Sequence, residues 1–176
     1  MNKEKTTILL ADDHSIVRRG IKALLEYEPD FAVVAEASDG VQALQQLETV
    51  KPDVLVTDLC MPNMSGIDLL NAIKEKNLPV RSVVLSMCGD IPYVTRALEA
   101  GAYGYVLKES GVEHLVIAIR EAREGRRYLS PPLSLTEATT SVSGADPQNC
   151  PSIPPESTHP KSNLSRISPF TFNPGL

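Results

Sequence analysis

The sequence predicts an α/β domain with a doubly wound (βα)5 fold and a parallel five-stranded sheet, followed by a tail of different composition. Up to about residue 128, short apolar runs alternate with amphipathic stretches of helical period. One run, VLV at 54–56, has no polar alternation, which is typical of a parallel strand buried on both faces. Nine of the fourteen prolines lie after residue 130, where both helix and strand are disfavoured.

The first two strand–helix pairs begin near the N-terminus. The apolar run ILLA at 8–11 predicts a strand, and an amphipathic helix over 14–27 follows it. The predicted buried face of that helix consists of Ile16, Val17, Ile21, Leu24 and Leu25. FAVVAEA at 31–37 predicts the second strand, and Asp39 with Gly40 then begins the second helix.

Three more pairs complete the predicted domain. The predicted strands are 52–58, 81–86 and 102–108, and the predicted helices are 66–76, 93–101 and 112–125. Gly101 and Gly125 stand at helix ends, where glycine is favoured. Strands that alternate with helices favour a parallel sheet covered on both faces, with right-handed crossovers between the strands.

Charged and hydroxyl side chains follow four of the predicted strands. Asp12 and Asp13 end the first strand, Asp58 the third, Ser86 the fourth and Lys108 the fifth. Because the carboxyl ends of parallel strands share one edge of the sheet, these side chains are expected to converge in one crevice. In the alternative interpretation, the acid pair only faces water and caps the following helix.

The chemistry of this set is coherent. Clustered carboxylates bind a hard cation such as Mg²⁺ through oxygen. A carboxylate can also be the nucleophile that accepts a phosphoryl group, with a lysine and a metal ion neutralising the charge. A flavodoxin-like nucleotide or flavin binder is a rival of the same topology, but the acid pair after the first strand would repel a phosphate there.

Four motifs, LLADDH, VLVTDLCMPNMSGIDLL, VVLSM and GAYGYVLK, closely resemble the receiver domain of bacterial two-component response regulators. The resemblance covers residues 5–128 and is strongest to the NarL/FixJ subfamily, whose members carry a LuxR-type helix-turn-helix. It implies the flavodoxin-like receiver fold with strand order 2-1-3-4-5. It also implies a signalling domain that is no separate enzyme but assists its own phosphorylation and dephosphorylation.

The resemblance assigns Asp58 as the phosphoacceptor. It implies that Asp12 and Asp13 hold Mg²⁺ together with Asp58 and the backbone carbonyl of Cys60. Relatives with a helix-turn-helix often have Asn where Cys60 stands, so the resemblance does not fix the lifetime of the phosphoryl group.

The same resemblance assigns the switch. Ser86 would follow the phosphoryl group, Lys108 would contact it, and Tyr105 stands where the family keeps an aromatic that turns inward on activation. Many receivers have Pro after the lysine, and here the residue is Glu109.

The implied partners are a sensor histidine kinase or phosphotransfer protein, and a second copy bound through the face formed by 93–101, 102–108 and 112–125. DNA binding is typical of relatives, yet the net charge of −5 gives no basic signature for nucleic acid. Without a membrane-length apolar stretch or a signal peptide, the expected location is the cytoplasm.

The tail, 129–176, is rich in Pro, Ser and Thr and is predicted to be disordered. It contains no recognisable helix-turn-helix, which suggests an output domain lost through a shift in reading frame. The alternative to a transcription regulator is therefore a stand-alone receiver that acts through protein contacts or as a phosphate sink.

Overall fold

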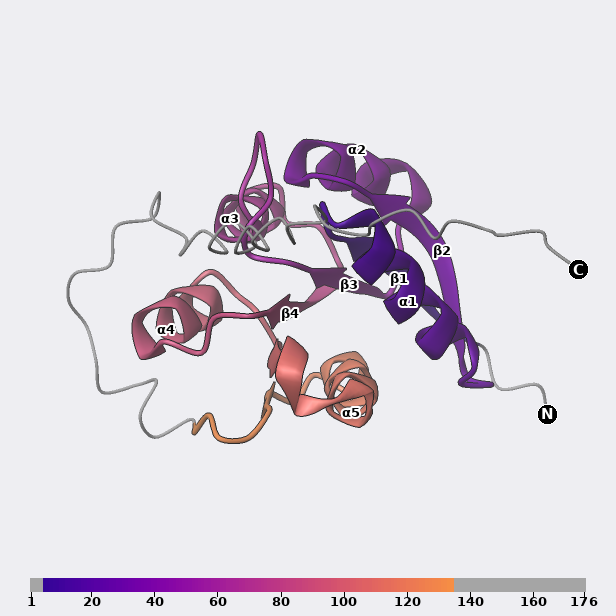
Figure 1. Cartoon of the computed structure of the whole chain (residues 1–176). Helices are drawn as coiled ribbons and strands as arrows, with labels where there is room; N and C mark the ends of the chain where they lie inside the picture. The colour runs from indigo at the N-terminus through magenta and orange to yellow at the C-terminus, as the bar shows by residue number, and fades with distance from the viewer. Residues whose placement is uncertain (1–4, 135–176) are drawn as a thin grey trace, which may run out of the picture.

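The predicted sheet forms (Figure 1), and the strand pairing adds a short sixth strand at one edge. The computed structural model describes residues 5–134, and the predicted tail beyond residue 134 lies outside them. The strands are β1 (Thr6–Ala11), β2 (Phe31–Ala37), β3 (Val54–Thr57), β4 (Arg81–Ser86), β5 (Gly104–Leu107) and β6 (Tyr128–Leu129). The helices are α1 (Ser15–Glu26), α2 (Gly40–Val50), α3 (Gly66–Glu75), α4 (Ile91–Glu99), the 3-10 turn η1 (Lys108–Ser110) and α5 (Val112–Arg123).

All strand pairs are parallel, in the order β2-β1-β3-β4-β5-β6. The predicted order 2-1-3-4-5 is therefore confirmed, with β6 added beside β5. Tyr128 pairs with Gly104 and Leu129 with Tyr105, so β-pairing continues past the residue where the sequence analysis ended the domain. A strand of two residues is too short to show an alternating pattern in the sequence.

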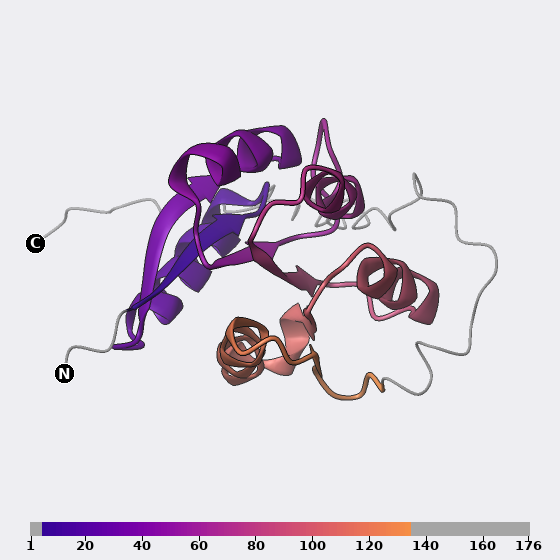
Figure 2. The same ribbon diagram turned by 180° about the vertical axis from the view of Figure 1, so that it is seen from behind.

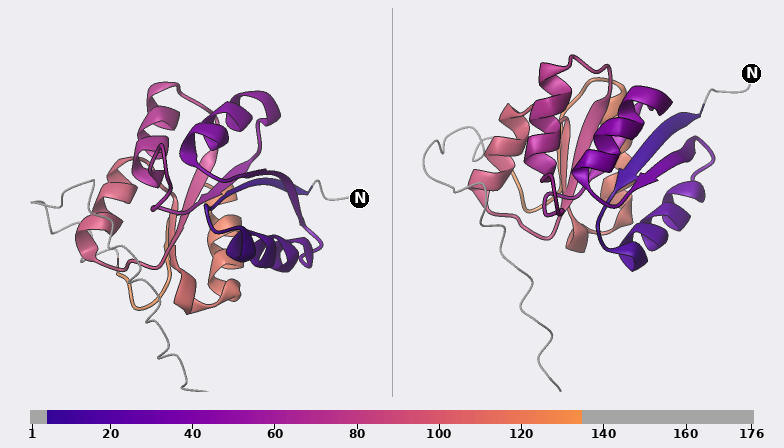
Figure 3. Two further views of the ribbon diagram at one scale, coloured as in Figure 1. Left: turned by 45° about the horizontal axis from the view of Figure 1, so that its top comes forward. Right: turned by 90° about the horizontal axis from the view of Figure 1, so that it is seen from above.

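Successive strand residues point to opposite faces of the sheet, and both faces are covered by helices (Figures 2 and 3). Ile8 and Leu10 belong to the core beneath α1 and α5, whereas Leu9 belongs to the core beneath α2 and α3. The whole of β3 is buried, as its unbroken apolar run predicts. This burial on both sides explains why the central strands carry almost no polar residues before their carboxyl ends.

The predicted buried face of α1 is only partly right. Leu25 is completely buried and Ile21 packs beside it, but Ile16 is 85% and Leu24 50% exposed. Ile16 and Leu25 are separated by about two and a half helical turns, so they point in opposite directions. Tertiary packing fixed Leu25 against the sheet, and Ile16 had to face solvent.

The order of the strands locates the crevice. β1 and β3 are neighbours, although β2 and two helices come between their ends in the sequence. The chain therefore leaves β1 toward one face of the sheet and leaves β3 toward the other, which opens a gap between the two following loops. Among residues 5–134, the helices are all too short or too polar to cross a membrane.

Two adjacent leucines of α1 test this packing. We expect Leu25→Ala to lower the free energy of unfolding by about 3 kcal/mol, because it leaves a cavity in the core. Leu24→Ala is the matched control and should cost less than about 1 kcal/mol, since its side chain is already half in water. Urea denaturation measures both, and equal losses would contradict the observed orientation of α1.

Candidate functional site

The two carboxylates that end β1 have different environments. Asp12 is 1% exposed, its amide donates to the carbonyl of Ala37 at 3.1 Å, and its Oδ1 accepts from the amide of His14 at 2.8 Å. Asp13 is exposed. The N-cap position of α1 is held by His14, so the interpretation that the acids simply cap this helix from water does not hold for Asp12.

Asp58 follows β3 and lies beside the end of β1. Its amide donates to the carbonyl of Ala11 at 2.9 Å, which continues the ladder between the two strands. Asp58 is only 5% exposed, and its Oδ1 accepts from the amides of Leu59 at 2.7 Å and Cys60 at 3.4 Å. These two hydrogen bonds hold the Asp58 carboxylate in one orientation.

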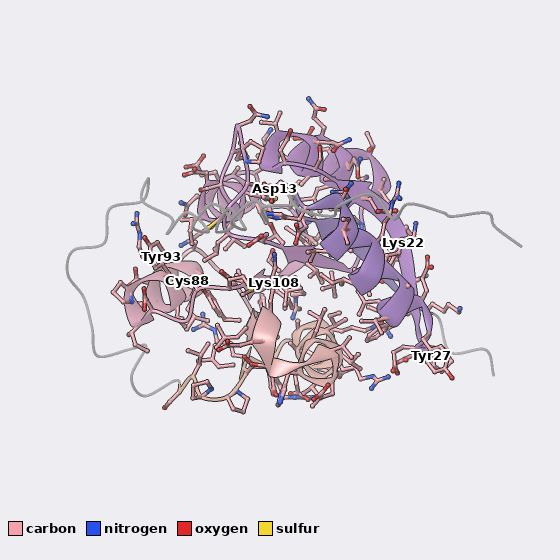
Figure 4. All side chains as sticks on the ribbon, viewed as in Figure 1. Asp13, Lys22, Tyr27, Cys88, Tyr93 and Lys108 are labelled. Carbon is pink, nitrogen blue, oxygen red and sulfur yellow. The ribbon has the colours of Figure 1, made fainter. Side chains whose placement is uncertain are left out.

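Lys108 joins the two buried acids. Its Nζ donates to Oδ2 of Asp12 at 2.8 Å and to Oδ2 of Asp58 at 2.7 Å, and its side chain is only 13% exposed. Figure 4 shows Lys108 projecting from the end of β5 toward the side where Asp13 lies. The structure therefore brings together three strand ends that the sequence places far apart.

The pKa shifts follow from this burial. Burial raises the pKa of the Asp58 carboxyl above its ordinary value, the charge of Lys108 opposes the rise, and the charge of Asp12 adds to it. Burial also disfavours the charged form of Lys108, but the two carboxylates outweigh that effect and hold its pKa above the ordinary value. The lysine therefore stays a cation at neutral pH.

Ser86 and Tyr105 meet on the backbone of Cys88. Both residues are buried; Oγ of Ser86 accepts from the Cys88 amide at 3.1 Å, and the Tyr105 hydroxyl donates to the Cys88 carbonyl at 2.6 Å. Burial raises the pKa of the Tyr105 phenol, so it remains a neutral donor. The aromatic ring is thus turned inward, and Ser86 is engaged with the loop that leads to α4.

The loop after Asp58 is packed closely against it. The amide of Gly66 donates to the carbonyl of Leu59 at 2.8 Å, and a Cβ on Gly66 would lie 2.3 Å from the carbonyl oxygen of Asp58. Asn63 takes a left-handed conformation with φ of 65° and donates through Nδ2 to Asp39 at the start of α2. The loop is therefore closed at its base by the Leu59–Gly66 hydrogen bond and tied to the start of α2 through Asn63.

Oxygen ligands for a cation gather in this crevice. Ligand atoms of Asp12, Asp13, His14 and Asp58 all lie within 4.8 Å of one another. Three of the four residues are carboxylates, which suits a hard divalent ion such as Mg²⁺ better than a soft metal. Nδ1 of His14 lies 2.8 Å from Oδ1 of Asp13, a contact that sequence reasoning missed because it took His14 only as a helix start.

Two further residues at the site escaped the sequence analysis. Arg18 donates through Nη1 to the backbone carbonyl of Asp12, and Ser130 accepts from the amide that precedes Lys108. The spacing of His14 and Arg18, one helical turn apart on the same face, is the only sequence signal that could have indicated Arg18. Ser130 lies in a segment whose composition resembles a linker.

Comparison with known proteins supports the resemblance. The profile of the response regulator receiver domain matches residues 8–120. The nitrate/nitrite response regulator NarL of Escherichia coli K12 is 42% identical over 133 residues, which are 76% of this chain and 62% of NarL. The transcriptional regulatory protein DegU of Brevibacillus brevis is 37% identical over 131 residues, covering 74% of this chain and 56% of DegU. The chain thus spans less than two thirds of these curated relatives.

Among solved structures, the isolated receiver domain of RcsB from Salmonella enterica serovar Typhimurium, determined with the phosphomimetic BeF₃⁻, superposes with a TM-score of 0.68. It is 29% identical to this chain, and the superposition covers 73% of this chain and 95% of that domain.

Gly66 tests the close contact with Asp58. We expect Gly66→Ala to lower the free energy of unfolding by about 1–3 kcal/mol, because the new methyl group collides with backbone that cannot rotate away. Gly20→Ala in α1 is the control; its Cβ would meet nothing within 4 Å and should stabilise the helix by up to about 1 kcal/mol. Thermal and urea unfolding report both, and a neutral Gly66→Ala contradicts the observed contact.

Lys108 tests the electrostatics. We expect Lys108→Met to raise the pKa of Asp58 further, because the cation that opposes the effect of burial is lost. A carboxyl whose pKa is higher in the folded than in the unfolded protein takes up a proton on folding. Stability therefore falls as pH rises from the unfolded value, about 3.9, through the folded pKa, and in the variant the fall extends to higher pH and is larger in total.

Carbon-13 NMR of the Asp58 carboxyl measures this titration directly. Lys22→Met is the matched control, because Lys22 pairs with Glu36 at 2.6 Å, away from the crevice. An Asp58 titration that is the same in Lys108→Met and in the parent protein would rule out the proposed electrostatic coupling.

Proposed function

Because the chain belongs to the response regulator receiver family, we propose that Asp58 accepts a phosphoryl group and that residues 5–128 act as a phosphorylation-controlled switch. The observation that carries this proposal is the Lys108 ammonium, which lies 2.7 Å from Asp58 and 2.8 Å from Asp12 in a buried crevice. A carboxylate held beside a cation and further acidic residues has the chemistry of an acceptor for an anionic group.

The step begins when a carboxylate oxygen of Asp58 attacks phosphorus. An O–P bond forms while the P–N bond of a phosphohistidine breaks, and the leaving imidazole takes up a proton from solvent. The amides of Leu59 and Cys60 hold the carboxylate in one orientation, so little reorganisation is needed. Lys108 offsets the negative charge that the incoming group brings into the crevice.

The carboxylates of Asp12, Asp13 and Asp58, with the backbone carbonyl of Cys60, are the residues that would hold Mg²⁺. The oxygen-rich donor set fits this ion, which when bound supplies positive charge to the phosphoryl oxygens. Arg18 helps to position Asp12 by donating to its backbone carbonyl. The chain catalyses no separate turnover in this proposal and assists only its own phosphorylation and dephosphorylation.

The switch involves Ser86 and Tyr105. The Ser86 hydroxyl turns to donate to an oxygen of the phosphoryl group, which is a charged acceptor, and its Oγ leaves the Cys88 amide from which it now accepts. The Cys88 backbone is then free to move, and Tyr105, bound to the Cys88 carbonyl, follows it. The result is a shift between two states of the face made by α4, β5 and α5.

The partner that supplies the phosphoryl group is a sensor histidine kinase or phosphotransfer protein in the cytoplasm. Kinship with NarL and DegU favours control of transcription, and the α4–β5–α5 face is the candidate dimer surface. The second candidate is a stand-alone receiver that acts by protein contacts or as a phosphate sink; it is favoured by the Pro-, Ser- and Thr-rich composition from residue 129 onward, in which no helix-turn-helix is recognisable.

Acetyl phosphate tests the acceptor. We expect one phosphoryl group on Asp58 in the full chain with Mg²⁺, found by mass spectrometry, and none when the metal is chelated. Asp58→Asn should abolish the label, because an amide cannot attack phosphorus in this way. Asp68→Asn, an exposed carboxylate that accepts a hydrogen bond from Ser65, is the control and should label normally. Undiminished labelling of Asp58→Asn places the acceptor elsewhere.

A further inference from the structure

We propose that the segment Tyr128–Leu133, here called the exit segment, clamps the turn that carries Lys108, with Ser130 as the positioning residue. Binding of a phosphoryl group, or of an analogue of it, to Asp58 is here called loading. Loading loosens this clamp, and the released exit segment passes the change to the chain that follows. The inference rests on the proposed function of Asp58. It concerns the residues that connect the crevice to the end of the described chain.

Backbone hydrogen bonds hold the exit segment along the edge of β5. The amide of Tyr128 donates to the carbonyl of Tyr103 at 2.9 Å, and the amide of Ser130 donates to the carbonyl of Tyr105 at 3.0 Å. The amide of Leu133 then donates back to the carbonyl of Ser130 at 3.0 Å and closes a turn. The exit segment is therefore the neighbour of β5 at the edge of the sheet.

The side chain of Ser130 ties the exit segment to both ends of the lysine turn. It is fully buried, and its Oγ accepts from the amide of Leu107 at 2.9 Å, one residue before Lys108. The same Oγ lies 3.1 Å from Oγ of Ser110, the last residue of η1, which also donates to the carbonyl of Pro131 at 3.0 Å. The three-residue turn is thus held before and after the lysine.

Apolar packing connects the same elements. Leu129 and Leu133 pack against a buried cluster that includes Leu107 and Tyr105. Leu59, whose amide holds the Asp58 carboxylate, belongs to that cluster too. A displacement beside the acceptor is therefore transmitted to the side chains on which the exit segment rests.

Phosphorylation changes the position that Lys108 prefers. The ammonium is now shared between two carboxylate oxygens, and a phosphoryl group presents new anionic oxygens farther from the backbone of Asp58. Lys108 follows the new charge and pulls on a turn that Ser130 and Ser110 hold at its two ends. The weakest contacts, the neutral hydroxyl hydrogen bonds of the clamp, give way first.

Hydrogen exchange on the full chain tests the clamp, with and without beryllofluoride and Mg²⁺ as the loading agent. In the parent protein we expect loading to speed exchange at the Tyr128 and Ser130 amides. In Ser130→Ala we expect the Leu107 amide to exchange about fivefold faster before loading, the factor for one lost neutral hydrogen bond. The response of the exit segment to loading should then be largely lost.

Two further variants keep the test independent of folding. Ser110→Ala removes the partly exposed hydroxyl at the far end of the turn and should weaken the response while the Leu107 amide stays protected. Ser82→Ala removes a buried serine hydroxyl from the opposite end of β4 and should leave the response intact. A purely structural role for Ser130 would slow or speed exchange equally with and without loading.

The outcomes separate the two proposals. If acetyl phosphate labels Asp58 but loading leaves exchange in the exit segment unchanged, the clamp is wrong and the acceptor stands. If Ser130→Ala responds to loading as the parent does, Ser130 is not the positioning residue. If Asp58 takes no label, both proposals fall together.

Discussion

The ammonium of Lys108 between two buried carboxylates is the interaction on which the rest of the site depends. Asp12 and Asp58 lie at the ends of neighbouring strands, almost out of contact with water. Without the cation, two like charges would be buried side by side. Taking an ion pair out of water seldom stabilises a fold more than apolar packing does, so this arrangement is better explained by chemistry than by stability.

The reach of the lysine also constrains the sheet. β5 is not the neighbour of β3, because β4 lies between them, and Lys108 has to extend past the end of β4 to touch Asp58. A long side chain makes that span possible. The last residue of β4, Ser86, is small and buried, and it carries the hydroxyl that the proposed switch requires. The small side chain of Ser86 and the long side chain of Lys108 are therefore compatible at this edge of the sheet.

Sequence reasoning found the fold and the strand-end residues because a parallel sheet leaves little freedom. Each apolar run ends where a polar side chain begins, and the topology brings those ends to one edge. It failed for α1, where Ile16 and Leu25 are both apolar and only packing against the sheet decides which is buried. It also passed over Ser130, since two residues of strand in a linker-like composition give no periodic signal.

Two series of hydrogen bonds connect the crevice to the exit segment, and they begin on different strands. One runs from Ser86 through the backbone of Cys88 to the hydroxyl of Tyr105. The other runs from Lys108 through the Leu107 amide to Ser130. They converge on β5, because the carbonyl of Tyr105 accepts from the Ser130 amide. In the proposed function, a change at Asp58 reaches this strand edge both through the Ser86 hydroxyl and through the Lys108 ammonium, and the exit segment paired with β5 is placed to respond to both.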